Sequence, residues 1–137
     1  MADITQTAAN VGMSGAGGSL KNRRGGEALT QGQPYYLSTS DGKAYRCDSD
    51  AAASAVAAGI VLTPCATDGY FVGAENGSIV DLGATLTVGE TFCVSTNVGA
   101  VAPIGDLTTG DFVTILGSAS AADTLTLNIY VSGVAKP

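Results

Sequence analysis

The chain has 137 residues and a mass of 13.5 kDa, and its 45% hydrophobic content is typical of one folded domain and too high for a disordered tail. Only 13% of the residues are charged, which leaves little charge to cover a monomer and favours an oligomer. The net charge of −6 and the absence of histidine argue against a nucleic-acid-binding protein and against catalysis by a histidine base. No apolar run reaches the ~18 residues that span a bilayer, and residues 1–5 lack the basic and apolar parts of a secretory signal.

The first 25 residues differ from the rest of the chain. They are rich in glycine, and their few apolar residues follow neither the period of a strand nor that of a helix. This pattern predicts an extended N-terminal arm over residues 1–25, flexible on its own and ordered against a partner, before a β domain over residues 26–137. A folded domain should therefore remain when the arm is deleted.

Charge is distributed unevenly along the chain. Five of the six basic residues precede Cys47, and none lies between Cys47 and Ala135, where the acids are expected in turns or on an acidic outer face. A basic arm on an acidic protein favours a partner with exposed carboxylates, and the alternative is that the arm packs on its own oligomer. The candidate partner-binding residues are Ile4, Val11, Met13, Leu20, Lys21, Arg23 and Arg24.

An internal repeat begins after the arm. Residues 26–39, GEALTQGQPYYLST, match residues 83–96, GATLTVGETFCVST, without a gap. Gly32 and Gly89 are expected to supply the positive φ of a tight turn, and the apolar alternation after each glycine predicts a strand. Two similar β units, about 26–82 and 83–137, would then close on each other.

The remaining pattern predicts an all-β fold, a compact antiparallel β-sandwich or small barrel. Residues 124–131 alternate between polar and apolar side chains, and short β segments are expected at 59–63, 69–72, 78–82 and 111–119. One short helix is predicted over residues 51–58, because acids that can cap it precede the run and a glycine follows it.

The sequence predicts no catalytic, metal or cofactor site. Cys47, Cys65 and Cys93 match no zinc spacing, and their odd number prevents complete pairing, so buried reduced thiols made in a cytoplasm are expected. Asp106 and Asp111 form the nearest acidic pair, but the sequence indicates no aromatic platform near them on which a sugar ring could stack. The glycine-rich run at 15–19 lacks the preceding strand, the lysine and the following helix of a phosphate-binding loop.

Motifs of the second unit carry a resemblance to a known family. They are LTVGETFCVS at 86–95, GAVAP at 99–103, DLTTGDFVTILGSA at 106–119 and LTLNIYVSGV at 125–134. These segments resemble the small capsid decoration, or cement, proteins of tailed bacteriophages. The similarity covers residues 80–137 well and the first unit less well, and its motifs are structural ones, made of turns and strand alternation.

The resemblance implies a non-enzymatic structural protein of the virion. Such a protein would be made in the host cytoplasm, form a homotrimer on the capsid exterior and stabilise the shell by clamping neighbouring major capsid subunits, with no nucleic-acid or membrane partner. A head fibre, a spike or an adhesin module that binds a host surface glycan is the alternative. That module would need exposed aromatic residues, which make up 6% of the chain and include no tryptophan. Binding to purified capsids or to host glycans discriminates between the two.

Overall fold

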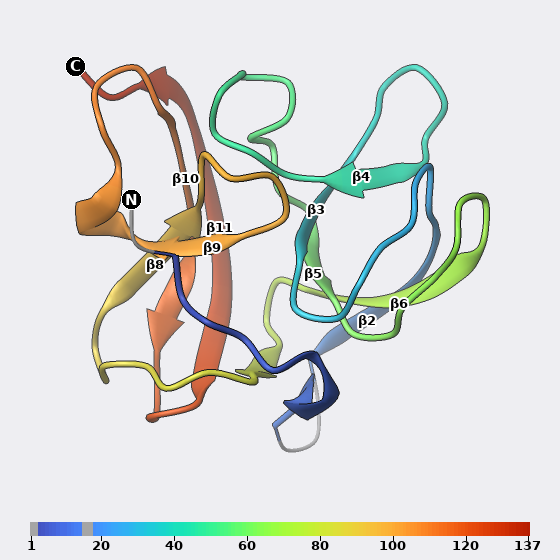
Figure 1. Cartoon of the computed structure of the whole chain (residues 1–137), viewed down its shortest axis with the longest axis horizontal. Coiled ribbons are helices and arrows are strands. Elements are labelled where there is room, and N and C mark those ends of the chain that lie inside the picture. Colours follow the sequence, from blue (N-terminus) through green and yellow to red (C-terminus); the bar gives the residue numbers. More distant parts are fainter. Residues whose placement is uncertain (1–2, 15–17) are drawn as a thin grey trace.

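The computed structural model describes residues 3–14 and 18–137, which form two antiparallel sheets without an α-helix (Figure 1). No helix in these residues is long and apolar enough to cross a membrane. The six-stranded sheet, in the order β1-β7-β11-β10-β8-β9, contains β1 (Val11–Met13), β7 (Ile79–Leu82), β8 (Thr91–Val94), β9 (Val101–Pro103), β10 (Phe112–Ala119) and β11 (Thr124–Ala135). The five-stranded sheet, in the order β2-β6-β5-β3-β4, contains β2 (Ser19–Arg24), β3 (Pro34–Leu37), β4 (Ala44–Arg46), β5 (Gly59–Val61) and β6 (Tyr70–Glu75). Two short 3-10 turns, Ala8–Asn10 and Ile104–Asp106, complete the regular structure.

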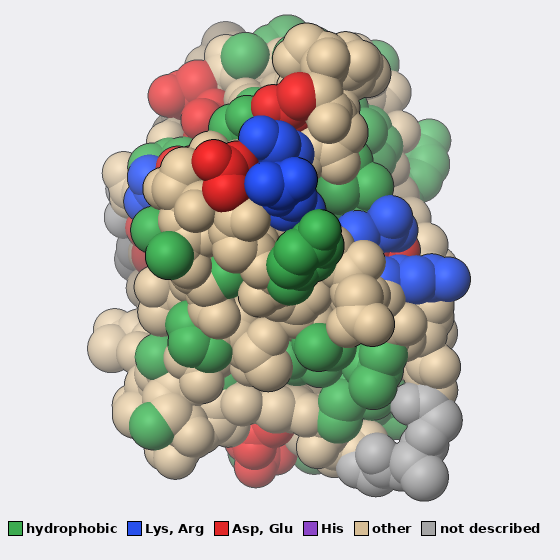
Figure 2. Space-filling model, turned by 90° about the vertical axis from the view of Figure 1, so that its right-hand side faces the viewer, with side chains coloured by type: hydrophobic (Ala, Val, Ile, Leu, Met, Phe, Trp, Pro, Cys, Tyr) green, Lys and Arg blue, Asp and Glu red, His purple; other side chains and the backbone are tan. Residues whose placement is uncertain are grey.

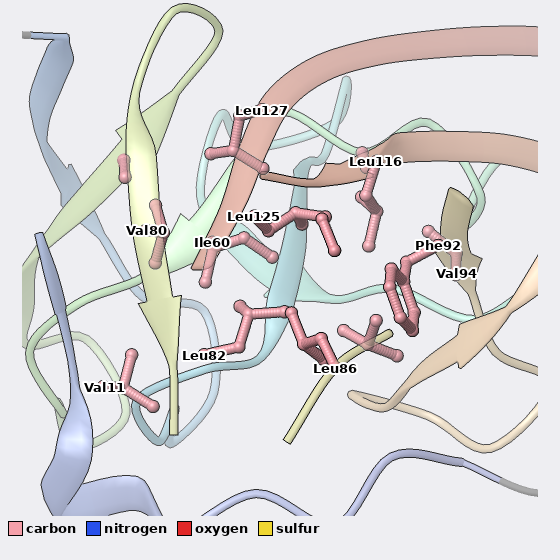
Figure 3. Packing of buried hydrophobic residues seen from close by; sticks show 14 of the residues in the cluster. Val11, Ile60, Val80, Leu82, Leu86, Phe92, Val94, Leu116, Leu125 and Leu127 are labelled. Atoms are coloured by element: carbon pink, nitrogen blue, oxygen red, sulfur yellow. The ribbon is translucent and has the colours of Figure 1, made fainter. Parts of the chain in front are cut away.

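The two sheets enclose one main core. Ile60 and Ala74 of the five-stranded sheet belong to the same buried cluster as Phe92, Leu116 and Leu125 of the six-stranded sheet, and none of these five is more than 1% exposed. Figure 3 shows Ile60 among the leucine side chains of the other sheet. Two antiparallel sheets that bury their facing side chains together form a β-sandwich, so the predicted fold class is confirmed.

The strand order of one sheet is repeated in the other. The order β6-β5-β3-β4 matches β11-β10-β8-β9, and β2 and β7 occupy equivalent places beside β6 and β11. The β3–β4 hairpin pairs Tyr35 with Arg46, and the β8–β9 hairpin pairs Phe92 with Pro103, at equivalent positions of the sequence repeat. The sequence repeat thus corresponds to a repeated arrangement of strands.

The glycines of the repeat have the backbone conformation that the sequence predicts. Gly32 and Gly89 have φ values of 88° and 86°, a region that residues with a side chain rarely adopt. However, the boundary between the two repeat units, expected after residue 82, does not coincide with the division between the two sheets. Strand β7 precedes that boundary but is part of the six-stranded sheet. The second unit therefore begins one strand earlier than the sequence match.

The described part of residues 1–25 is not a separate arm. Strand β1 pairs with β7, and β2 pairs with β6 along its whole length, from Ser19 opposite Glu75 to Arg24 opposite Tyr70. The expectation of an arm outside the β domain is therefore wrong for these residues, while residues 1–2 and 15–17 lie outside the described part. The local sequence shows no period because each strand is short and pairs with a segment far along the chain.

Residues 51–55 form a turn and residues 56–58 have no regular structure, where the sequence predicts a helix. The Asp48 carboxylate accepts a hydrogen bond from the Ser54 hydroxyl at 3.0 Å, and the Ala58 N–H donates to the Tyr35 carbonyl at 2.7 Å. The Ala55 N–H donates to the Ala51 carbonyl at 3.1 Å, as in a single helical turn, but the turn does not continue. A helix is marginal at this length without packing support. The predicted short helix is therefore wrong.

Candidate partner-binding surface

Strand β2 is one of the two outer strands of the five-stranded sheet and carries the basic residues singled out in the sequence. Its inner side pairs with β6, and its outer side faces no other strand of the described residues. Leu20 is 52% exposed, and Lys21 and Arg24 are also exposed. An open strand edge presents unpaired backbone groups that an extended segment of a partner can bind.

Arg23 is held by an acid of the neighbouring strand. Its Nε and Nη2 atoms donate to the two carboxylate oxygens of Glu75, both at 3.0 Å, and the Tyr35 hydroxyl donates to the same carboxylate at 2.6 Å. Burial, followed by hydrogen bonding to Glu75, raises the pKa of Tyr35, so that the hydroxyl keeps its proton and remains a donor. Arg23 therefore has a carboxylate partner within the protein itself, whereas the sequence assigns its charge to a contact with another molecule.

Arg24 lies at the end of β2 beside an exposed tyrosine. Its Nε atom donates to the Asp68 carbonyl at 3.1 Å, and its guanidinium carbon is 5.8 Å from the centre of the Tyr70 ring, in cation–π geometry. Lys43 binds the Asp68 carboxylate at 2.7 Å and holds its pKa below the usual value. Tyr70 is 74% exposed, so Arg24 and this ring together present a positive and aromatic surface.

The five basic residues that precede Cys47 lie on the five-stranded sheet and its turns. Three of them form ion pairs, namely Arg23 with Glu75, Lys43 with Asp68 and Arg46 with Glu27. Figure 2 shows Lys and Arg side chains gathered on the face at the right of Figure 1, beside acidic and exposed hydrophobic side chains. Among the described residues, Lys21 and Arg24 form no ion pair with a carboxylate. We call Leu20, Lys21, Arg24 and Tyr70 the basic β2 edge.

The other apolar candidates are used inside the protein. Val11 is a buried member of the main core, and Ile4 and Met13 are partly buried against it. The Ile4 N–H also donates to the Val101 carbonyl at 3.0 Å. Val11 is therefore enclosed in the core, Ile4 and Met13 are half-buried, and Leu20 is the most exposed of the four apolar candidates.

Sequence reasoning missed Tyr70 and Glu75, which complete the surroundings of β2. Both residues lie on β6, about 50 positions along the chain from the strand that they contact. The alternation that predicts a strand near residues 69–72 indicates neither its neighbour nor the ion pair. Only the pairing of β2 with β6 brings these groups together.

A polar depression of about 530 Å³ lies where the N-terminal segment passes β7, and no pattern in the sequence indicates it. Its lining carries no aromatic side chain, and the Asp81 carboxylate accepts a hydrogen bond from the Gly83 N–H at 2.8 Å within its own turn. It therefore offers no stacking surface for a sugar ring. The lining residues are Thr5, Thr7, Asn10, Asp81, Gly83, Ala84, Thr85 and Asp123.

One member of the acidic pair considered for sugar hydrolysis, Asp111, has a structural role. Asp111 is 7% exposed, and its carboxylate accepts hydrogen bonds from the N–H and the hydroxyl of Thr108, at 2.7 and 3.1 Å. It therefore caps the turn before β10. In the described part of the chain, no group of three or more Cys, Asp or Glu side chains could hold a metal ion.

The three thiols differ in exposure, and we expect them to differ in reactivity. Cys47 and Cys93 are buried, and burial raises the pKa of both thiols, that of Cys93 to about 12, whereas Cys65 is partly exposed. Because the thiolate is the reactive form, a thiol reagent at neutral pH should modify Cys65 in the folded protein and all three thiols after denaturation. Mass spectrometry of the labelled chain tests this, with Cys65→Ser as the control. Rapid labelling of Cys47 or Cys93 in the folded protein would contradict it.

Comparison with known proteins adds no candidate partner. No protein-family model, curated protein or solved structure matches the chain. The exposed residues of the basic β2 edge are therefore the starting point for a function.

Proposed function

We propose that this protein is a structural virion protein that binds the outside of a tailed-phage capsid and stabilises the shell. It acts as a homotrimer that clamps neighbouring major capsid subunits, and it is made in the host cytoplasm before it joins the virion. The proposal begins with the resemblance of residues 80–137 to capsid decoration proteins. The observation that carries it is an open strand edge whose Lys21 and Arg24 side chains are exposed and form no ion pair with a described carboxylate, on a chain of net charge −6.

The basic β2 edge suits an extended, acidic segment of a major capsid subunit. Such a segment would extend the five-stranded sheet through backbone hydrogen bonds, while its carboxylates face Lys21 and Arg24. Leu20 and Tyr70 would lose their exposure in the contact and add apolar burial. Charge pairs at the rim of such a contact set its register and speed its formation.

Binding of this kind stabilises a shell by mass action. A ligand that binds only the assembled shell lowers its free energy at every occupied site. In a trimer, one bound subunit holds the other two at high effective concentration near their own sites, and avidity follows. This mechanism requires no catalytic group.

Co-sedimentation with purified heads of the encoding phage tests the proposal. We expect the full chain to pellet with the heads, and we expect K21Q/R24Q to bind about tenfold more weakly at low salt, with a smaller difference at high salt. The matched control is T87E/V88E, which changes the net charge by the same amount in a turn of the other sheet and should bind normally.

Two results would contradict the proposal. One is a full chain that binds host cells or host glycans and leaves capsids undecorated, which is the outcome expected of a fibre or adhesin module. The other is capsid binding that K21Q/R24Q and T87E/V88E weaken equally, because net charge and not the basic β2 edge would then be responsible.

A further inference from the structure

The last strand of the chain extends beyond its sheet. Strand β7 covers β11 over Thr124–Thr126 only, while β10 pairs with the opposite side of β11 as far as Ala135. The Asn76 side chain accepts a hydrogen bond from the Ile129 N–H at 2.7 Å and ends the coverage on this side. From residue 130 to residue 135, the outer side of β11 faces no strand of the described residues. We call this segment the β11 extension.

The repeat shows that the β11 extension is additional to the common fold. Its counterpart β6 has 6 residues and is covered along its whole length by β2, whereas β11 has 12 residues. No residue of the β11 extension is buried, so the core of the protein does not depend on it. Its sequence is therefore free to serve a contact with another molecule.

The chemistry of the β11 extension differs from that of the basic β2 edge. Tyr130, Val131 and Val134 are 59%, 37% and 62% exposed, and neither β10 nor β11 contains a charged residue. Proteins commonly place charged side chains on open strand edges to prevent unwanted pairing, as the basic residues of β2 do. The β11 extension has no such protection, and a long uncharged apolar edge is the kind of surface that another chain covers.

We propose that the β11 extension is the contact between copies of this chain. Each copy carries a net charge of −6, so two copies repel each other over most of their surfaces and approach most favourably where both are uncharged. An acidic partner would form no ion pair at the uncharged β11 extension, whereas it could form two at the basic β2 edge, with Lys21 and Arg24. Tyr130 is the large side chain expected to contribute most, since buried tyrosines often dominate such contacts.

This inference deepens the homotrimer part of the proposed function, and it does not depend on capsid binding. The test measures mass against concentration by light scattering for the full chain, for Tyr130→Lys and Val134→Lys, and for the controls Val88→Lys and Val98→Lys. The control side chains are 64% and 48% exposed and lie elsewhere on the surface. We expect a trimer for the full chain and for the controls, and a dissociation constant at least about thirtyfold higher for the two β11 variants.

Hydrogen exchange of the full chain is the second measurement, and it does not depend on the folding of any variant. Protection of those N–H groups of residues 130–135 that point away from β10 should increase with protein concentration, because association covers them. A full chain that is monomeric at every concentration, β11 variants that remain trimeric, or exchange that does not change with concentration would each overturn the inference. A trimer that fails to bind capsids would contradict capsid binding and leave the inference standing. A monomer that binds them would contradict the inference and the homotrimer part of the proposed function, and would leave capsid binding standing.

Discussion

Deletion of residues 1–25 is expected to abolish the cooperative unfolding transition of this protein or to lower its midpoint by tens of degrees. The deletion removes β1 and β2, and with them one outer strand of each sheet. It also takes Val11 out of the main core and leaves Glu75 without Arg23. Domains of this size are stable by only about 5–15 kcal/mol, and two lost strands remove a large share of that.

Thermal unfolding followed by circular dichroism measures this effect. Two full-length variants show which side chains of the segment contribute to stability. Val11→Ala should lower the free energy of unfolding by about 1–2 kcal/mol through lost burial, and Lys21→Ala, at an exposed position, should lower it by less than about 0.5 kcal/mol. A truncated chain that unfolds cooperatively at the same temperature as the full chain would show that the segment is a dispensable arm after all.

Replacement of Glu75 by glutamine should be the most destabilising single change of charge. Glu75 accepts two hydrogen bonds from Arg23 and one from Tyr35, and its side chain is 15% exposed while that of Arg23 is 30% exposed. Removal of one partner from a fully buried ion pair costs about 3–5 kcal/mol, and the partial exposure of Arg23 reduces our expectation to about 2–3 kcal/mol.

The chain provides a matched control in Glu27→Gln. Glu27 binds Arg46 through a similar pair of contacts, but both side chains are about one third exposed, so the expected cost is below about 1 kcal/mol. Urea denaturation of the two variants compares the costs directly. Equal losses of stability would show that the lower exposure of Glu75 has no energetic consequence.

The sequence predicted those parts of the fold that depend on local pattern. Alternation predicts the strand at residues 124–131 because one face of β11 packs on the core through Leu125 and Leu127. The two repeat glycines predict tight turns because only a residue without a side chain readily adopts a positive φ. Both signals lie within a few residues of the structure that they specify.

Features that depend on distant partners were not predictable in the same way. Strand β2 forms because β6 offers it hydrogen bonds and because Glu75 binds Arg23, and neither condition is visible in residues 19–24. The alanine run at 51–58 fits a helix by propensity, yet hydrogen bonds to Asp48 and Tyr35 hold it in turns. The basic residues of the candidate surface were identified, but their partners on β6 were not.

The pairing of the N-terminal strands has a consequence for the order of events during synthesis. Strand β2 emerges from the ribosome roughly 50 residues before β6, and β1 emerges roughly 70 residues before β7. At about 5–20 residues per second, the first 25 residues wait several seconds for their partners. A glycine-rich, basic segment with few apolar side chains is suited to that interval, because it has little tendency to aggregate while it is unpaired.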